Sequence, residues 1–299
     1  MKQIISYSRR TDGIAFYIDR LKKAIEDEMI DVQNPFNKKI SQVSLKPNDV
    51  AGFVLWSKDF QNLLENWDIF LKYIPNTLIS ANKIIPIYLQ FTRNSIAKVL
   101  EPYAPSLEKS FSQIDELVEI ASSDHIMWRF DPIVFWKEDD ILVNNLDDFE
   151  EIASHFASVG VKKCTISFVT YYAKVEQRMK KNSFNFNKIS GREMINTVKN
   201  LVSIANKYKI KIYACCNPDL LNTSEIFPAH CIDGNYLSKL WNVKLSKAKD
   251  SGQRESCGCT KSRDIGGYNK EWKCHFGCLY CYVNPDHQIY ERKKKEIDK

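Results

Sequence analysis

The sequence has 299 residues, of which 44% are hydrophobic and 27% charged, and its formal net charge is +6. This balance is typical of a folded protein and unlike that of disordered or collagen-like chains. No apolar run approaches the ~20 residues that span a bilayer, and Arg9 and Arg10 come before the apolar core of a signal peptide could form, so we expect a cytoplasmic protein without a membrane partner.

Short runs rich in β-branched and aromatic residues alternate along the chain with stretches of helical periodicity. The runs are Ile4–Ser8, Val50–Ser57, Ile85–Thr92, His125–Val134, Val161–Val169 and Ile210–Cys216. The periodic stretches are Ile14–Met29, Phe60–Tyr73, Leu107–Ala121, Phe149–Phe156 and Arg192–Tyr208. Strands that alternate with helices indicate βαβ units and a parallel sheet.

One face of each run becomes polar toward its C-terminal end, as at Arg129 and Asp131 or at Thr165 and Ser167. A strand covered by helices on both sides should be apolar throughout. Apolar residues hold the alternate positions, which we expect to pack against helices: Ile5, Leu55, Leu89, Phe91, Phe130, Ile166, Phe168 and Ile212. The polar positions either line a cup at the strand ends or satisfy one another in the core, and we favour the cup.

The pattern predicts an α/β fold with a six-stranded partial (β/α) barrel, similar to a TIM barrel. Residues 1–220 would form the barrel core. Residues 221–299 would form a Cys-rich segment packed on the barrel mouth, so that the two parts make one structural unit.

Charged and polar residues follow the predicted strands, where barrels carry their functional loops. Arginine there suits a carboxylate or phosphate, which its guanidinium binds with two hydrogen bonds, and an internal Arg–Asp ion pair is an equal alternative. Our candidates for catalysis are Arg10, Asp12, Lys58, Gln90, Arg129 and Asp131. Our candidates for binding a cofactor are Arg9, Arg10, Trp56, Asn217 and Tyr280.

The chain has nine cysteines, and an odd count argues against a disulfide framework. Cys274, Cys278 and Cys281 supply three thiolates from a loop short enough to surround one [4Fe–4S] cluster, which usually takes four Cys ligands. One iron would stay open to another molecule. A zinc site is the alternative, in which Cys257 and Cys259, our additional candidate ligands, would join two of these three thiols.

The other cysteines give weaker signals. Only one of the adjacent Cys215 and Cys216 can face the cup, and Cys215 is the better candidate. For these two and for Cys231 we favour the role of small buried hydrophobes. Cys164 lies at the start of a predicted strand and is expected to be structural.

Cys274, Cys278, Tyr280 and Cys281 resemble the Cys-x3-Cys-x-aromatic-Cys signature of radical S-adenosylmethionine enzymes, in particular the loop of the spore photoproduct lyase branch. The resemblance implies a [4Fe–4S] cluster, S-adenosylmethionine, an electron donor of flavodoxin or ferredoxin type and a six-stranded partial (β/α) barrel. In that family the loop follows the first strand, but here it follows the sixth, which implies a permuted connection. The Gly-Gly-Glu motif that holds the methionine end of the cofactor is not seen.

Over nearly its full length the chain resembles a bacterial family known as domain of unknown function 1848. The matching pieces are Ser8–Asp12, Asn34–Asn37, Trp56–Lys58, Gln90–Thr92, Trp128–Pro132, Ser167–Phe168, Ala214–Cys216, Cys231–Asp233, Gly252–Arg254, Cys257–Cys259 and Ser262–Gly266. This family implies no reaction, but it implies a C-terminal cluster like that of radical enzymes.

The sequence therefore favours a radical S-adenosylmethionine-type enzyme that acts on an unknown substrate. The alternative is a non-catalytic Fe–S or zinc protein with a redox or nucleic-acid-binding role. Converging polar strand ends favour the enzyme, since a pure binding module has no need of them. Nucleic acid has weak support, because the basic run at 292–295 is typical of a solvated tail and no basic stripe is present.

Overall fold

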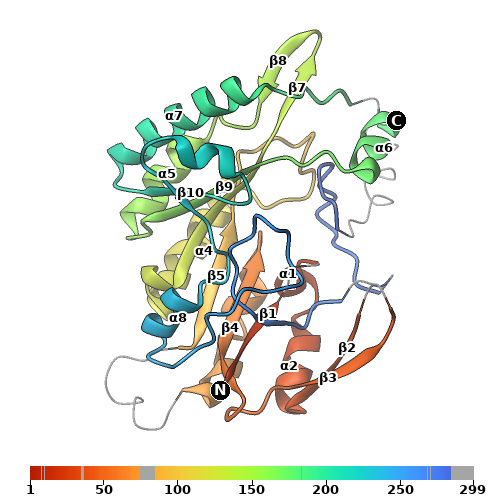
Figure 1. The fold of residues 1–299 in the computed structure, drawn as a ribbon, viewed down its shortest axis with the longest axis vertical. Coiled ribbons are helices and arrows are strands. Elements are labelled where there is room, and N and C mark those ends of the chain that lie inside the picture. The colour runs from red at the N-terminus through yellow and green to blue at the C-terminus, as the bar shows by residue number, and fades with distance from the viewer. Residues whose placement is uncertain are drawn as a thin grey trace.

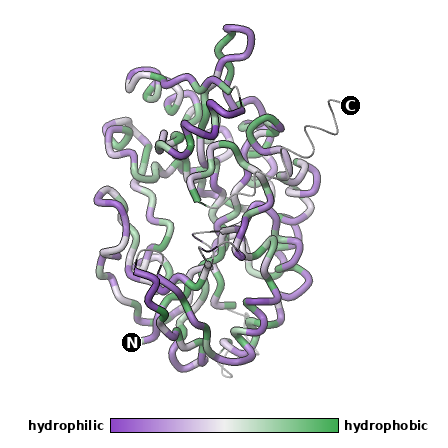
Figure 2. Tube along the Cα trace, turned by 90° about the vertical axis from the view of Figure 1, so that its right-hand side faces the viewer, coloured by the Kyte–Doolittle hydropathy of each residue, from purple (hydrophilic) through white to green (hydrophobic). Residues whose placement is uncertain are grey.

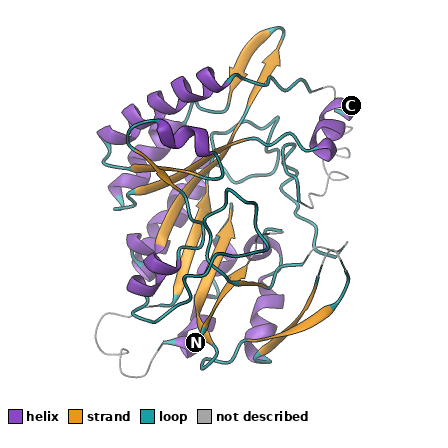
Figure 3. Ribbon diagram, viewed as in Figure 1, coloured by secondary structure: helices purple, strands orange, loops and turns teal. Residues whose placement is uncertain are grey.

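The computed structural model describes residues 1–299 except 8, 10, 35–36, 75–84, 183, 268, 270 and 284–299. Its centre is an eight-stranded sheet in the order β11-β10-β9-β6-β5-β4-β1-β12, and all neighbouring strands are parallel (Figures 1 and 3). The strands are β1 (Gln3–Tyr7), β4 (Val50–Ser57), β5 (Ile87–Thr92), β6 (Ile126–Ile133), β9 (Lys163–Phe168), β10 (Lys211–Ala214), β11 (Ile226–Pro228) and β12 (Arg263–Asp264).

The predicted α/β fold is confirmed, but the number of strands differs. The six predicted strands form the middle of the sheet in chain order, and β11 and β12 extend its two edges. These edge strands have three and two residues, too few for a period-two pattern to mark them in the sequence.

The helices agree with the sequence best where the periodic pattern is longest. The helices are α1 (Gly13–Phe16), α2 (Ile18–Glu26), α3 (Gln61–Leu64), α4 (Leu107–Ala121), α5 (Phe149–Ser158), α6 (Ala173–Lys181), α7 (Gly191–Lys207) and α8 (Gly234–Leu240). The 3₁₀ helices in the described part of the chain include η1 (Trp67–Tyr73), η3 (Ser123–His125) and η4 (Pro218–Asn222). Ser190 and Glu193, three positions apart, begin α7 with a reciprocal capping box.

Two predicted helices are each split in the structure. Tyr17, with φ −140°, separates α1 from α2, and Asn66, with φ −137°, separates α3 from η1. The sequence pattern did not indicate α6, α8 or the antiparallel hairpins β2–β3 (Met29–Gln33, Ile40–Ser44) and β7–β8 (Phe135–Glu138, Ile141–Asn144). No helix in the described part of the chain is long and apolar enough to cross a membrane.

The two faces of the sheet are covered differently. On one face, α4, α5 and α7 bury the main core, which contains all of the alternate positions predicted to face helices (Figure 1). On the other face, Ile4, Val54 and Tyr88 pack against α8 and against the segment that carries Cys257 and Cys259. Figure 2 shows mainly hydrophilic segments along the outside of the trace and hydrophobic ones within it.

The C-terminal segment returns to the first strand. β12 pairs with β1, with Ile5 opposite Arg263 and Ser6 opposite Asp264. The residues that follow β12 therefore start beside the turn after β1, and this brings the cysteine loop to the same end of the sheet.

Candidate functional site

A cavity of about 540 Å³ lies at the C-terminal ends of the parallel strands. Its volume is in the range of ligand pockets in general. Its lining includes Arg129, Asp131, Ser167 and Cys215, which the sequence pattern placed toward the cup, the cofactor candidates Trp56 and Asn217, and Thr92 at the end of β5. The cup interpretation of the polar positions therefore agrees with the geometry better than mutual satisfaction in the core.

Arg129 and Asp131 on β6 form an ion pair at the cavity wall. Asp131 also accepts a hydrogen bond from the Ser167 hydroxyl. Arg129 donates to Gln90 Oε1 at 3.2 Å and to Cys231 Sγ at 3.0 Å, so its guanidinium is held on several sides. The two charges are partners, as the sequence suggested, and they form a fixed polar wall.

Gln90 does not face the cavity as predicted. Its side chain is fully buried, donates to the Cys231 carbonyl at 2.9 Å and accepts from Arg129. The register of β5 against β6 places Gln90 beside Met127, two positions before Arg129. Gln90 therefore does not line the cavity, but its hydrogen bonds hold the Arg129 side chain and the Cys231 backbone in place.

Arg9 enters the cavity from the turn after β1. Its Nη1 donates to Asp250 Oδ2 at 3.4 Å, and its Nη2 is buried with no hydrogen-bond partner among the described residues. The guanidinium carbon lies 5.7 Å from the centre of the Trp56 ring, which also lines the cavity. A cationic N–H without an acceptor is suited to an anionic ligand. Arg10 lies outside the described residues.

Asp12, one of our candidates for catalysis, is held by hydrogen bonds within the protein. Its carboxylate accepts from the Ser57 hydroxyl at 2.7 Å, from the Lys58 backbone N–H at 2.9 Å and from Ala15 N–H at 3.1 Å. Burial raises its pKa to about 6. Asp12 therefore joins the turn after β1 to the end of β4, and it has little capacity left for a substrate.

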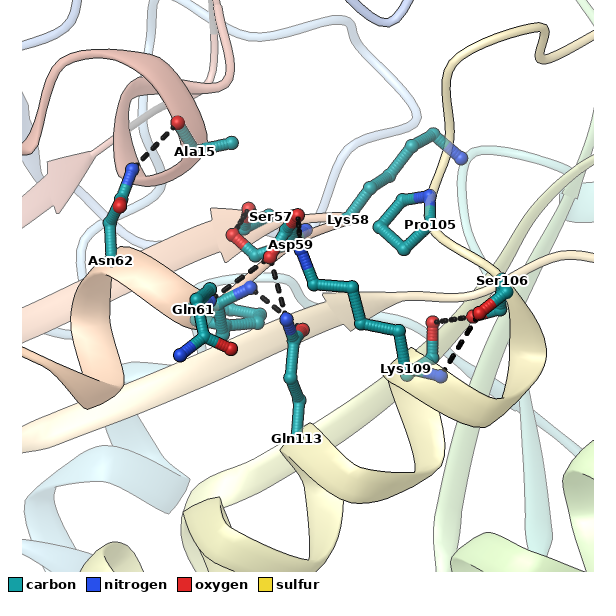
Figure 4. A network of polar contacts seen from close by, with 12 residues as sticks. Ala15, Ser57, Lys58, Asp59, Gln61, Asn62, Pro105, Ser106, Lys109 and Gln113 are labelled. Carbon is teal, nitrogen blue, oxygen red and sulfur yellow. Dashed lines mark hydrogen bonds and ion pairs between the residues drawn. The ribbon is translucent and has the colours of Figure 1, made fainter.

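Lys58, another candidate for catalysis, is not among the residues that line the cavity. Figure 4 shows that it extends away from the network in which Asp59 accepts from Gln61, Lys109 and Gln113. Its ammonium instead donates to Glu101 Oε2 at 2.8 Å, inside the protein.

Glu101 and Asn94 are site residues that the sequence analysis missed. Glu101 accepts from the Tyr280 hydroxyl at 2.5 Å and from Asn94 at 2.7 Å. Burial opposes its ionisation, but Lys58 and these hydrogen bonds hold the pKa of Glu101 below its ordinary value. Their position shortly after the predicted strand 85–92 was the available signal, since loops after strands converge at this rim.

The cysteine loop is anchored between the turn after β1 and the loop after β5. Just before it, Thr11 donates to the Trp272 carbonyl at 2.6 Å. Phe276 packs on Phe16 with ring centres 4.7 Å apart. Leu279 N–H donates to the Leu100 carbonyl at 2.9 Å. The loop therefore lies beside the turn after β1 although it is the last described segment of the chain.

Arg178 on α6 binds the backbone of the cysteine loop. Its Nη1 donates to the carbonyls of Leu279 at 2.8 Å and Cys281 at 2.5 Å. No sequence signal pointed to Arg178, because helix α6 itself was not predicted.

The thiols of Cys274, Cys278 and Cys281 belong to one packed group with Phe276 and Tyr280. Burial raises the pKa of Cys278 well above its ordinary value, and the negative charge of the Glu101 carboxylate raises it further. A metal that binds Cys278 must therefore displace the proton of this thiol. The Lys58 ammonium lies near enough to lower this pKa and to offset a negative charge on the thiolates. The donor set therefore fits an iron–sulfur cluster.

No group of three His, Cys, Asp or Glu side chains among the described residues is arranged to hold a metal ion. A single tetrahedral ion needs all its sulfurs about 2.3 Å from one centre. A cubane does not, because each thiolate binds a different iron. The mixed zinc site is also disfavoured, since Cys257 and Cys259 pack in a different group of side chains from the loop thiols.

Comparisons with known proteins give the following matches. The model of a family described as "Domain of unknown function (DUF1848)" matches residues 4–283. Streptococcus suis SuiB bound to S-adenosylmethionine is 12% identical with a TM-score of 0.32, and the match covers 96% of this chain and 54% of that one. SuiB bound to precursor peptide SuiA is 13% identical with a TM-score of 0.31, covering 94% and 51%. The chain thus spans about half the length of these structures, and no curated protein matches it.

Proposed function

The chain belongs to the family described as domain of unknown function 1848, and from this starting point we propose that it is an iron–sulfur enzyme of the radical S-adenosylmethionine type. The observation that carries the proposal is the position of the three-thiol loop, whose Cys281 and Tyr280 line the polar cavity at the strand ends. A cluster bound there would expose its open iron toward a space of ligand size.

Cys274, Cys278 and Cys281 would hold the [4Fe–4S] cluster. When bound and reduced, such a cluster supplies one electron that breaks a C–S bond of S-adenosylmethionine, giving methionine and a carbon radical that takes hydrogen from the substrate. The protein supplies position and charge around this chemistry. Arg178 fixes the loop backbone through two carbonyls, and Lys58 offsets negative charge beside Cys278.

Arg9 is our candidate for binding the cofactor's carboxylate, because its Nη2 lacks a partner and the residue lines the cavity. Trp56 would present an apolar face to a flat ring, and Asn217 would offer an amide from the opposite edge of the sheet. Asp131 would face the cofactor's ammonium group. These assignments replace the missing Gly-Gly-Glu motif with residues of this chain.

The permuted connection is part of the proposal. Residues 1–220 would form an open, barrel-like core, and the Cys-rich segment from 221 would complete its mouth as part of the same unit. The pairing of β12 with β1 supports this arrangement, since it carries the late loop to the position that follows the first strand. An electron donor of flavodoxin or ferredoxin type would reduce the cluster.

Electron paramagnetic resonance of the reduced, anaerobically assembled protein tests this proposal. We expect a [4Fe–4S] signal that changes when S-adenosylmethionine is added, because the open iron and the cofactor are in contact. Cys278→Ala should lose the response to S-adenosylmethionine, whereas Cys164→Ala, which removes a buried thiol in the helix-facing core, should keep it. A wild-type signal that does not respond to the cofactor favours the non-catalytic Fe–S alternative, and zinc without labile sulfide favours the zinc alternative.

A further inference from the structure

Five cysteines outside the loop gather around the same cavity. They are Cys215, Cys216, Cys231, Cys257 and Cys259, and all five line the cavity together with Cys281. They come from three separate segments: the end of β10, the turn after β11 and the loop that precedes β12. We refer to these five residues as the thiol ring.

Each sulfur of the thiol ring lies next to two others. Cys215 Sγ is 3.9 Å from Cys216 Sγ and 4.0 Å from Cys231 Sγ. The circle continues through side-chain contacts from Cys216 to Cys257, from Cys257 to Cys259 and from Cys259 to Cys231. Thiols that only fill a core have no reason to meet in this way from three segments of the chain.

Arginine side chains and hydrogen-bond donors surround the thiol ring. Arg129 donates to Cys231 Sγ at 3.0 Å, and the Ile232 N–H donates to Cys259 Sγ at 3.4 Å. Arg9 lies close enough to Cys231 and Cys259 to act on their charge, as Arg254 does on Cys216. Two of these three guanidinium groups are also paired with carboxylates, Arg129 with Asp131 and Arg9 with Asp250. N–H donors to sulfur are a means by which proteins tune iron–sulfur clusters.

The Cys257-Gly258-Cys259 turn packs closely against the segment that carries Cys231. A Cβ on Gly258 would lie 2.4 Å from His230 Nε2, so only glycine lets the turn pack against the segment that carries Cys231. This contact keeps Cys257 and Cys259 on the same side as Cys231.

We propose that the thiol ring holds a second iron–sulfur cluster, which shares the cavity with the loop cluster. A cubane takes four thiolates, and the ring offers five. A zinc ion fits less well, because the contacts run around a circle whereas a tetrahedral site brings every sulfur near every other, and because structural zinc sites are closed while these thiols line an open cavity. The second site would place redox-active iron opposite Tyr280 and Cys281, on the far side of the bound ligand.

Metal analysis of the full-length chain, loaded anaerobically with ferrous iron and sulfide, tests the second site. Wild-type protein and the Cys164→Ala control should each contain about eight iron and about eight sulfide per chain, as expected for two cubanes. Removing the loop ligands (Cys274→Ala, Cys278→Ala and Cys281→Ala together) should leave about four of each. The ring variant, Cys231→Ser, Cys257→Ser and Cys259→Ser together, leaves two ring thiols, fewer than the three that the loop offers, and should also keep about four of each, now in the loop.

A folded loop variant that binds neither iron nor sulfide would overturn the second site, and so would a loop variant that binds zinc in place of both. If the loop variant does not fold, as judged by circular dichroism, the ring variant decides. The ring variant must then contain about four iron atoms per chain fewer than wild type, and an unchanged iron content overturns the proposal. This outcome is independent of the proposed function, whose failure would instead appear as a loop variant with the same iron content as wild type.

Discussion

At the scale of single residues, a buried charge network supports the aromatic residue of the cysteine loop. Lys58 and Glu101 are paired at 2.8 Å with side-chain exposures of 12% and 6%. Glu101 also binds the Tyr280 hydroxyl, and the Lys58 ammonium lies 5.9 Å from the centre of the Tyr280 ring. The position of Tyr280 therefore depends on a carboxylate that is far away in sequence.

Glu101→Gln should destabilise the protein by about 3 kcal/mol, because it leaves the Lys58 charge buried without its partner. Thermal or urea unfolding measures the change. Glu176→Gln removes an exposed partner of Lys188 and should change the melting temperature little. Equal losses of stability in the two variants would contradict a larger contribution from the buried Lys58–Glu101 pair.

His125 should make the stability depend on pH. Burial lowers its pKa from the ordinary 6.5 to about 4, so the unfolded chain binds this proton more readily than the native protein. The stabilisation is complete above pH 6.5 and is lost as the pH falls toward 4. Between pH 7 and pH 5.5 wild type should lose about 1 kcal/mol more than His125→Gln, measured by urea unfolding at both values. Parallel losses in the two proteins would contradict this shift.

At the scale of elements, the strands were easier to predict than the loops that carry the site. The runs around Leu89 and Phe130 have a period of two and lie in the helix-facing core, so their pattern follows directly from burial. Arg178 and Glu101 escaped prediction because their roles arise only when distant segments meet. The split between α1 and α2 at Tyr17 escaped for a related reason, since the Tyr17 hydroxyl is held by the distant Lys273 carbonyl at 2.8 Å.

The cysteine loop should be sensitive to the conformation of Gly277. Its φ of +66° is in the left-handed region, which costs other residues about 1–2 kcal/mol. Gly277→Ala should therefore lower the free energy of unfolding by about that amount and reduce the iron retained after gel filtration. Gly191→Ala, at the start of α7 with no atom within 4 Å of the new methyl group, is the matched control and should change neither quantity. A Gly277→Ala protein as stable as this control would be inconsistent with the loop geometry.

At the scale of the whole molecule, the last described segment completes a site begun by the first. Thr11 binds the Trp272 carbonyl, β12 lies beside β1, and the cysteine loop and the strand ends share one cavity. The sequence predicted the polar strand ends and the loop thiols separately. It could not predict that Cys215, Cys216 and Cys231 would meet Cys257 and Cys259, because no spacing links residues brought together only by the order of strands in the sheet.

The most direct test of this account is the reaction of the reduced, cluster-loaded protein with S-adenosylmethionine, followed by chromatography of the products. The account predicts 5′-deoxyadenosine and methionine from wild type and from Cys164→Ala, and neither product from Cys278→Ala. Arg9→Ala should keep the cluster and its colour but form the products more slowly, because Arg9 would act on the cofactor and not on iron. Wild-type protein that holds the loop cluster yet neither binds nor cleaves S-adenosylmethionine would contradict the assignment as a radical enzyme.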